Sequence, residues 1–222
     1  KKIKIYNAST SELFGSTIQK PQNEMTTFEP VSPYSIAKQY AFGISKIYRE
    51  AYGMFICNGI LFNHESPRRG LSFITRKISK AVSDIINNKI NFFSVGNLNA
   101  KRDWGYAKEY VVPMWKMLQK NKPDDYVIAT GKQYTVREFI TKCFKYVDKE
   151  ITWTGTGDKE LGKDKYGKTL VKVDKFYYRP NEVRDLLGDS KKAQKELNWK
   201  PKTNIDGLVK IMMDHDLNLK NE

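Results

Sequence analysis

The sequence predicts an α/β fold with a partial parallel sheet and a second, smaller α/β domain. Two observations indicate this. The first 65 residues follow the order strand, loop, helix, strand, which suits a parallel sheet with a right-handed crossover. Of the 222 residues, 40% are hydrophobic and 13% aromatic, enough for a buried core. We therefore expect a partial Rossmann-type sheet in residues 1–65, joined by later returning segments, while residues 66–222 form mainly the smaller domain.

The first elements carry clear local signals. Apolar residues predict strands at 3–8 and 54–62, the first of which ends at consecutive hydroxyl side chains. Between them, Ser32 followed by Pro33 is typical of a helix N-cap with proline at the first helical position. Gly53 is placed to end this helix.

The remainder of the chain mixes helices and strands. We expect helices at 78–86, 110–118, 139–147, 190–199 and 203–212, and strands at 91–95 and 126–129. Thr135 with Glu138 predicts a capping box, and Ser190 and Thr203 are expected to cap the last two helices. The Gly/Lys/Asp-rich segment 154–168 predicts a flexible surface loop, since its glycines lack the spacing of a phosphate-binding loop.

Composition excludes several classes of function. The net charge of +14 comes mostly from lysines spread along the chain, without an arginine-rich helix or zinc-finger spacing, so nucleic acid is not the expected partner. A substrate carrying phosphates would explain local positive charge equally well. We expect no membrane span, no signal peptide and a cytoplasmic location. Cys57 and Cys143 stand among apolar residues and predict buried free thiols, with no metal site or disulfide.

Four residues form a candidate catalytic set: Thr10, Glu12, Tyr34 and Lys38. On a helix, Tyr34 and Lys38 share a face. A tyrosine ordinarily ionises near pH 10, so use as a base at neutral pH requires roughly 4 kcal/mol of phenolate stabilisation. A lysine one turn away and a cationic cofactor ring can supply this. The alternatives are a surface Tyr/Lys pair and a carboxylate at a helix start, but the Thr10 hydroxyl after a strand favours catalysis.

The chain resembles the extended short-chain dehydrogenase/reductase family and, within it, the GDP-mannose 4,6-dehydratase family. Matching segments extend over nearly the whole sequence: 8–15, 32–38, 58–70, 75–78, 96–105, 127–131 and 178–183. The string Asn-His-Glu-Ser-Pro-Arg-Arg-Gly at 63–70 is much more specific than the Tyr/Lys pair.

The resemblance implies a lyase reaction at the sugar, with the cofactor unchanged at the end. Tyr34 is expected to take the proton from the hydroxyl on carbon 4 as hydride leaves for NADP, with Thr10 holding that hydroxyl. Lys38 is expected to hold the nicotinamide ribose. Glu12 is expected to remove the carbon 5 proton before water leaves from carbon 6. This residue would separate a dehydratase from an epimerase of the same fold.

The resemblance also implies ligand contacts and a biological setting. His64 and Arg69 match positions that contact NADP, together with Tyr34 and Lys38. The positions expected to contact the nucleotide sugar GDP-mannose are Asn63, Lys77, Arg102, Arg179 and Glu182, since a diphosphate favours arginine and lysine donors. Alternatives are a loop cation at Arg179 and a structural ion pair between Arg102 and Asp103. The implied pathway is synthesis of GDP-fucose and related deoxyhexoses, by a homo-oligomer.

The sequence departs from the family at its start, where a glycine-rich dinucleotide loop is expected but not present. We therefore expect a fragment that lacks the amino-terminal cofactor-binding part. Two other functions remain open: a dehydratase or epimerase for another nucleotide sugar, and a catalytically silent binding or structural piece.

Overall fold

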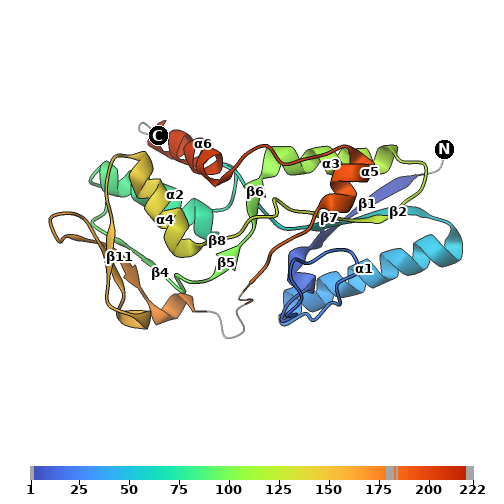
Figure 1. The fold of residues 1–222 in the computed structure, drawn as a ribbon, viewed down its shortest axis with the longest axis horizontal. Coiled ribbons are helices and arrows are strands. Elements are labelled where there is room, and N and C mark those ends of the chain that lie inside the picture. The colour runs from blue at the N-terminus through green and yellow to red at the C-terminus, as the bar shows by residue number, and fades with distance from the viewer. Residues whose placement is uncertain (1–2, 179–182, 184, 219–222) are drawn as a thin grey trace. The chain divides into compact units, whose positions relative to one another are not determined.

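The computed structural model describes residues 3–178, 183 and 185–218. The chain forms two compact units, each assembled from three separate segments (Figure 1). Unit 1 comprises Lys1–His64, Arg102–Gln133 and Val183–Lys202. Unit 2 comprises Glu65–Lys101, Tyr134–Glu182 and Thr203–Glu222.

Unit 1 is built on a parallel sheet, as the sequence predicts. Its strands are β1 (Lys4–Thr10), β2 (Phe55–Leu61) and β7 (Asp125–Ile128), in the order β1-β2-β7. The helix α1 (Pro33–Tyr52) connects β1 to β2. Both strand pairs are parallel, with Thr10 opposite Leu61 at the carboxyl end of β1. The predicted α/β fold class is therefore confirmed.

The start and end of α1 follow from local chemistry. The Ser32 side chain accepts a hydrogen bond from the Ser35 amide, and the Ser35 side chain accepts one from the Ser32 amide, which completes a capping box. Pro33 occupies the first helical position, where its missing N–H costs nothing. Gly53 ends the helix at φ 62°, a left-handed conformation that glycine adopts without strain.

The two faces of the unit 1 sheet are covered by different elements. The remaining elements of this unit are η1 (Ser11–Leu13), β6 (Trp104–Tyr106), α3 (Ala107–Gln119) and α5 (Lys191–Leu197). One buried cluster joins Ile60 and Val127 of the strands to Phe42 of α1. Alternate strand residues form a second cluster with α3 and α5. Because successive strand residues point to opposite faces, α1 covers one side and α3 with α5 the other.

Unit 2 combines a mixed sheet with three helices. Its strands are β4 (Phe93–Val95), β9 (Thr152–Thr154), β10 (Leu161–Lys163) and β11 (Thr169–Val173), and its helices are α2 (Ile74–Ile86), α4 (Val136–Tyr146) and α6 (Ile205–Asn218). The sheet order is β4-β11-β10-β9, parallel only between β11 and β4. The three helices pack on one another. Short strands β3 (Asn63–Glu65), β5 (Lys101–Arg102) and β8 (Tyr134–Thr135) lie where the chain passes between units.

The predicted loop at 154–168 is wrong in part. This segment holds the short helix η2 (Gly157–Lys159) and the strand β10, which pairs antiparallel with β9 and β11. A Cβ on Gly162 would lie 2.6 Å from Ile151 Cδ1, so this glycine permits close packing within the sheet. A turn helix, η3 (Lys175–Tyr177), follows β11.

The caps of the last two helices also differ from the prediction. Ser190 precedes α5, but its hydroxyl donates to the Ala129 carbonyl at 2.9 Å instead of capping the helix. The helix ends at Leu197, before the predicted 199, because Asn198 adopts a left-handed conformation. For α6, the Gly207 amide donates to Asn204 Oδ1 at 2.8 Å, so Asn204 provides the cap expected of Thr203. The predicted capping box of Thr135 and Glu138 is confirmed at α4.

The prediction that the two cysteines are buried free thiols is confirmed. Cys57 and Cys143 are both buried and free, and burial raises the pKa of each thiol. None of the helices within the described residues is long and apolar enough to cross a membrane.

Close packing at Gly59 gives a first stability prediction. A Cβ there would lie 2.6 Å from the buried Tyr6 hydroxyl, which has no hydrogen-bond partner among the described residues. Gly59→Ala should lower the free energy of unfolding by about 1–3 kcal/mol through overpacking. Urea denaturation measures this loss. Tyr6→Phe should be close to neutral alone and should recover part of the loss in the double variant, because it removes the nearest clashing atom. If the changes in the free energy of unfolding from the two single substitutions simply added in the double variant, the packing explanation would be contradicted.

The outer edge of β7 gives a prediction about pH. The Val127 amide donates to Glu24 Oε1 at 2.8 Å, and burial raises the pKa of Glu24. A carboxyl whose pKa is raised by folding costs stability as the pH rises above its unfolded pKa, and the full cost is present above its folded pKa. Glu24→Gln keeps an oxygen acceptor and should stabilise by about 0.5 kcal/mol at pH 7, a small effect because solvent screens a half-buried group.

Urea titrations at several pH values test this. The gain from Glu24→Gln should vanish as the pH falls below about 4.3, the ordinary pKa of glutamate in an unfolded chain. A gain that persists at low pH would show that charge burial at Glu24 is not its cause.

Candidate functional site

Thr10 and Glu12 lie together where β1 ends. Thr10 is the last residue of β1 and the N-cap of η1, and its Oγ1 accepts a hydrogen bond from the Glu12 amide at 3.3 Å. Both side chains are half-buried. Within the described part of the chain, the Glu12 carboxylate has no hydrogen-bond or ion-pair partner. Such a carboxylate remains available to a ligand.

Tyr34 and Lys38 lie in the first turns of α1. Lys38 Nζ is 5.8 Å from the centre of the Tyr34 ring and donates to the Ala8 carbonyl of β1 at 2.9 Å. The Tyr34 side chain is 51% exposed. The Lys38 contact ties the start of α1 to β1, two residues before Thr10. The structure therefore places the four predicted catalytic residues on three contacting elements of unit 1: β1, η1 and α1.

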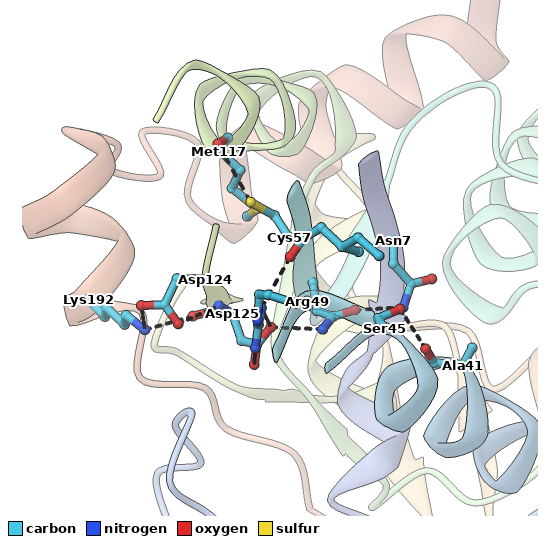
Figure 2. A network of polar contacts seen from close by, with 11 residues as sticks. Asn7, Ala41, Ser45, Arg49, Cys57, Met117, Asp124, Asp125 and Lys192 are labelled. Carbon is cyan, nitrogen blue, oxygen red and sulfur yellow. Dashed lines mark hydrogen bonds and ion pairs between the residues drawn. The ribbon is translucent and has the colours of Figure 1, made fainter. Parts of the chain in front are cut away.

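A buried polar network holds α1 on the sheet (Figure 2). Arg49, near the end of α1, binds Asp125 of β7 through both guanidinium nitrogens, at 2.7 and 2.9 Å. Asn58 Nδ2 donates to the same carboxylate at 2.8 Å, and Asn7 Nδ2 donates to Asn58 Oδ1 at 2.7 Å. The hydrogen bonds that Arg49 donates to the Asp125 carboxylate raise the pKa of Arg49. Lys192 of α5 extends the network through Asp124 and the Asp125 carbonyl.

Asn63 and His64 follow β2 in unit 1. His64 Nδ1 lies 2.8 Å from the Phe62 carbonyl, which requires Nδ1–H as donor and leaves Nε2 for another partner. The His64 ring stacks on Tyr110, with ring centres 5.1 Å apart and an angle of 22°. Asn63 is half-buried at the start of β3. The imidazole is thus fixed in orientation.

Arg69 of unit 2 is held by its own neighbours. Its Nε lies 3.3 Å from Glu65 Oε2, and its guanidinium carbon lies 3.6 Å from the centre of the Phe73 ring. The Glu65 carboxylate is buried and accepts a hydrogen bond from Thr75 Oγ1 at 2.6 Å. Arg76 donates to the Pro67 carbonyl and so also holds this loop. The specific string at 63–70 therefore includes a structural charge cluster.

The predicted substrate contacts are only partly placed. Lys77 Nζ lies 3.4 Å from the centre of the Tyr177 ring, within unit 2. Arg102 is half-buried in β5. Arg179 and Glu182 lie outside the described residues.

Asp103 has a structural role that the sequence analysis did not identify. It is fully buried and accepts hydrogen bonds from the Thr130 amide and hydroxyl and from the Gly131 amide, at 2.6–2.9 Å. The Gly188 amide adds a longer contact at 3.4 Å. Burial raises the pKa of Asp103, and these donors oppose the rise. The available sequence signal was a carboxylate between Arg102 and the aromatic Trp104.

Comparison with known proteins gives a consistent family assignment. A family model described as GDP-mannose 4,6 dehydratase matches residues 1–212. The chain is 55% identical to a GDP-mannose 4,6 dehydratase of Dictyostelium discoideum, over 98% of this chain and 61% of that protein. Proteins of the same name from Drosophila melanogaster and Homo sapiens are 52% and 53% identical, with 99% and 98% of this chain and 56% and 59% of the relative covered. The chain thus spans about 56–61% of the length of these curated relatives.

Solved structures share the fold. RMD from Pseudomonas aeruginosa, complexed with NADPH, superposes with a TM-score of 0.81 at 15% identity, over 98% of this chain and 67% of that one. The dTDP-glucose 4,6-dehydratase from Bacillus anthracis, in complex with NAD, gives 0.78 at 18% identity, over 98% and 62%. At these identities the likeness concerns the fold alone, and it agrees with the α/β class predicted from the sequence.

The charge cluster around Arg69 gives a testable prediction. Thr75→Val removes the hydroxyl donor to the buried Glu65 carboxylate and should lower the free energy of unfolding by about 2–3 kcal/mol. Thr152→Val is the matched control, because the Thr152 hydroxyl is exposed and donates to a carbonyl at 3.3 Å. The control should stay within about 0.5 kcal/mol of wild type. If Thr75→Val and Thr152→Val lowered the free energy of unfolding equally, the hydrogen bond to Glu65 would contribute no more to stability than an exposed one.

Proposed function

Because this chain belongs to the GDP-mannose 4,6-dehydratase family, we propose that it carries the catalytic residues of an enzyme that converts GDP-mannose to GDP-4-keto-6-deoxymannose. The observation that supports this most directly is the grouping of Thr10 and Glu12 at the end of β1 beside Tyr34 and Lys38 on α1. The net change is loss of water from the sugar, a lyase reaction. Its product would serve the synthesis of GDP-fucose and related deoxyhexoses.

The residues in unit 1 fit the nicotinamide side of NADP. Lys38 uses one of its three N–H donors on Ala8, which leaves donors for ribose hydroxyls. The Tyr34 hydroxyl has no hydrogen-bond partner within the described residues, and His64 presents Nε2. In unit 2, Arg69 forms an ion pair with Glu65, whose Oε2 lies 3.3 Å from Nε without a hydrogen bond. When bound, NADP supplies the site that accepts a hydride from carbon 4 and returns one to carbon 6.

Each catalytic residue has a task that its surroundings support. Tyr34 accepts the proton of the 4-hydroxyl, and the Lys38 ammonium lies on the same side of α1, 5.8 Å from the centre of the Tyr34 ring. The Thr10 hydroxyl orients the 4-hydroxyl. Once carbon 4 is a ketone, the carbon 5 proton is acidic, and the unpaired carboxylate of Glu12 removes it. Glu12, then protonated, donates to the hydroxyl that leaves carbon 6 as water. Carbon 5 must afterwards regain one proton, and the proton that Tyr34 took from the 4-hydroxyl equals it in number, so the protons balance over the whole reaction.

The nucleotide part of the substrate requires positive charge. Lys77 and Arg102 are proposed to bind the diphosphate, with Arg179 and Glu182 as further contacts and Asn63 as an amide partner. The half-buried positions of Lys77 and Arg102 agree with a role in which charge meets a ligand. Unit 2, which carries Lys77, would then be the main substrate-binding part. Homo-oligomerisation and a cytoplasmic location stay predictions.

Two substitutions separate the proposed steps. Tyr34→Phe should lower kcat by about 10²–10⁴-fold, because it removes the base needed for oxidation at carbon 4. Glu12→Gln should spare that oxidation, so reduced cofactor should accumulate in a single turnover while water is not lost. The measurements are absorbance of the reduced cofactor and NMR of the sugar product. They should be made on the 222-residue chain alone and on the chain joined to the amino-terminal segment of the Dictyostelium discoideum relative.

Matched controls are available on α1. Tyr40→Phe and Glu50→Gln change the same residue types at exposed positions and should leave kcat unchanged. Normal formation of the 4-keto-6-deoxy sugar by Glu12→Gln would refute its acid/base role. An altered configuration at carbon 4 without loss of water would favour an epimerase, and no reaction with any nucleotide sugar in either form would favour a non-catalytic piece.

A further inference from the structure

A row of polar side chains crosses the parallel sheet of unit 1. Asn7, Asn58 and Asp125 are direct partners on β1, β2 and β7 in the strand register. Their side chains are linked by hydrogen bonds of 2.7 and 2.8 Å, each with a defined donor and acceptor. Asn58 is fully buried and Asp125 is nearly so. A buried polar side chain costs free energy unless it is hydrogen-bonded. The side chains of this row can all form their hydrogen bonds only when the three strands keep this register.

Arg49 joins this row to α1 (Figure 2). Its two-pronged contact with Asp125 fixes the guanidinium in both position and plane. The same Nη1 lies 3.2 Å from the Ile56 carbonyl of β2, so one residue of α1 contacts two strands. A guanidinium bound in this way permits little sliding or rotation of the helix.

Apolar packing alone holds α1 weakly. Only Ser35, Phe42 and Ser45 of its 20 residues are buried, and only one of these is a large apolar side chain. Burial of one phenylalanine stabilises by about 1.5–3 kcal/mol and has no preferred direction. The Arg49–Asp125 pair is directional, so it determines where α1 lies along the sheet. The burial of Phe42 stabilises the packing of α1 on the sheet without fixing that position.

We propose that Arg49 and Asp125 are positioning residues, which set α1 so that Lys38 reaches the Ala8 carbonyl and Tyr34 faces the end of β1. Lys38 and Arg49 are 11 residues apart, about three turns of the same helix. The acceptor Ala8 directly follows Asn7, the first member of the polar row. The catalytic consequence rests on the proposed function, whereas the placement of Lys38 does not.

The first test measures the Lys38 contact in the 222-residue chain without any enzymatic assay. Lysines are acetylated in the folded chain with limiting reagent, and chymotryptic peptides are quantified by mass spectrometry. The readout is the rate at Lys38 divided by the rate at Lys46, which is exposed on the same helix. Arg49→Met and Asp125→Asn should raise this ratio about fivefold, the effect of losing roughly 1 kcal/mol from one hydrogen bond.

The controls distinguish positioning from general destabilisation. Arg137→Met removes a second two-pronged arginine–carboxylate pair, with Glu160 in unit 2, and should leave the ratio unchanged at a similar loss of stability. Arg49→Lys keeps the positive charge but cannot form the bidentate contact with Asp125. Its Lys38/Lys46 acetylation ratio should therefore lie between those of the wild type and Arg49→Met. An unchanged ratio in both Arg49→Met and Asp125→Asn, with the chains still folded by circular dichroism, would overturn the proposal. So would an equal rise in Arg137→Met.

The second test joins the proposal to catalysis. In the polypeptide that shows dehydratase activity, Arg49→Lys should lower kcat about tenfold with little change in the KM for GDP-mannose, because the catalytic residues and not the nucleotide contacts are displaced. A rise in KM alone would refute this link. Absence of activity both in the 222-residue chain alone and in the chain joined to the amino-terminal segment would count against the proposed function, and the acetylation ratio would still decide the role of Arg49 and Asp125.

Discussion

The pair between Arg49 and Asp125 is the interaction on which the arrangement of α1 and the sheet in unit 1 depends. It joins α1 to β7, and through Asn58 and Asn7 it reaches β2 and β1. Buried ion pairs contribute little net stability, because desolvation offsets much of the attraction, but breaking one leaves a costly unpaired charge. Such a pair therefore favours one arrangement over its near alternatives. In this structure Lys38 of α1 donates to the Ala8 carbonyl of β1, and its Nζ lies 5.8 Å from the centre of the Tyr34 ring.

The sequence predicts the elements whose signals are local. The helix α1 carries its start and stop in Ser32, Pro33 and Gly53, and the structure uses all three. By contrast, β10 has no such signal, since Gly162 and the surrounding lysines are typical of a loop. Its pairing partners, β9 and β11, supply hydrogen bonds that the sequence of the segment itself does not reveal. The same limit applies to Ser190, whose hydroxyl donates to a distant carbonyl instead of its own helix.

In the candidate site, too, some residues have a local sequence signal and others become neighbours only through the fold. Thr10, Glu12, Tyr34 and Lys38 can be selected as candidates from the sequence because their residue types and spacing suit the proposed chemistry. The polar row that supports them is not, since Asn7, Asn58 and Asp125 are distant in sequence and become neighbours only through strand pairing. Arg69 shows a further limit. A motif can mark it as a ligand contact, but the motif does not reveal that Glu65 and Phe73 also hold it in unit 2.

The division of each unit into three separate segments has a consequence for how the chain is made. Unit 1 begins with Lys1–His64, yet Ala193, Leu197 and Trp199 complete its second buried cluster. Unit 2 in turn requires α6, which begins at Ile205. A ribosome synthesises proteins from the amino terminus at about 5–20 residues per second, and domains generally fold as units. Neither unit can complete its core until translation has passed Trp199 for unit 1 and has continued through α6 for unit 2. During translation, apolar surface of both units would therefore be exposed at the same time. Cellular chaperones would bind exposed apolar segments of the two units together, and not of one unit after the other.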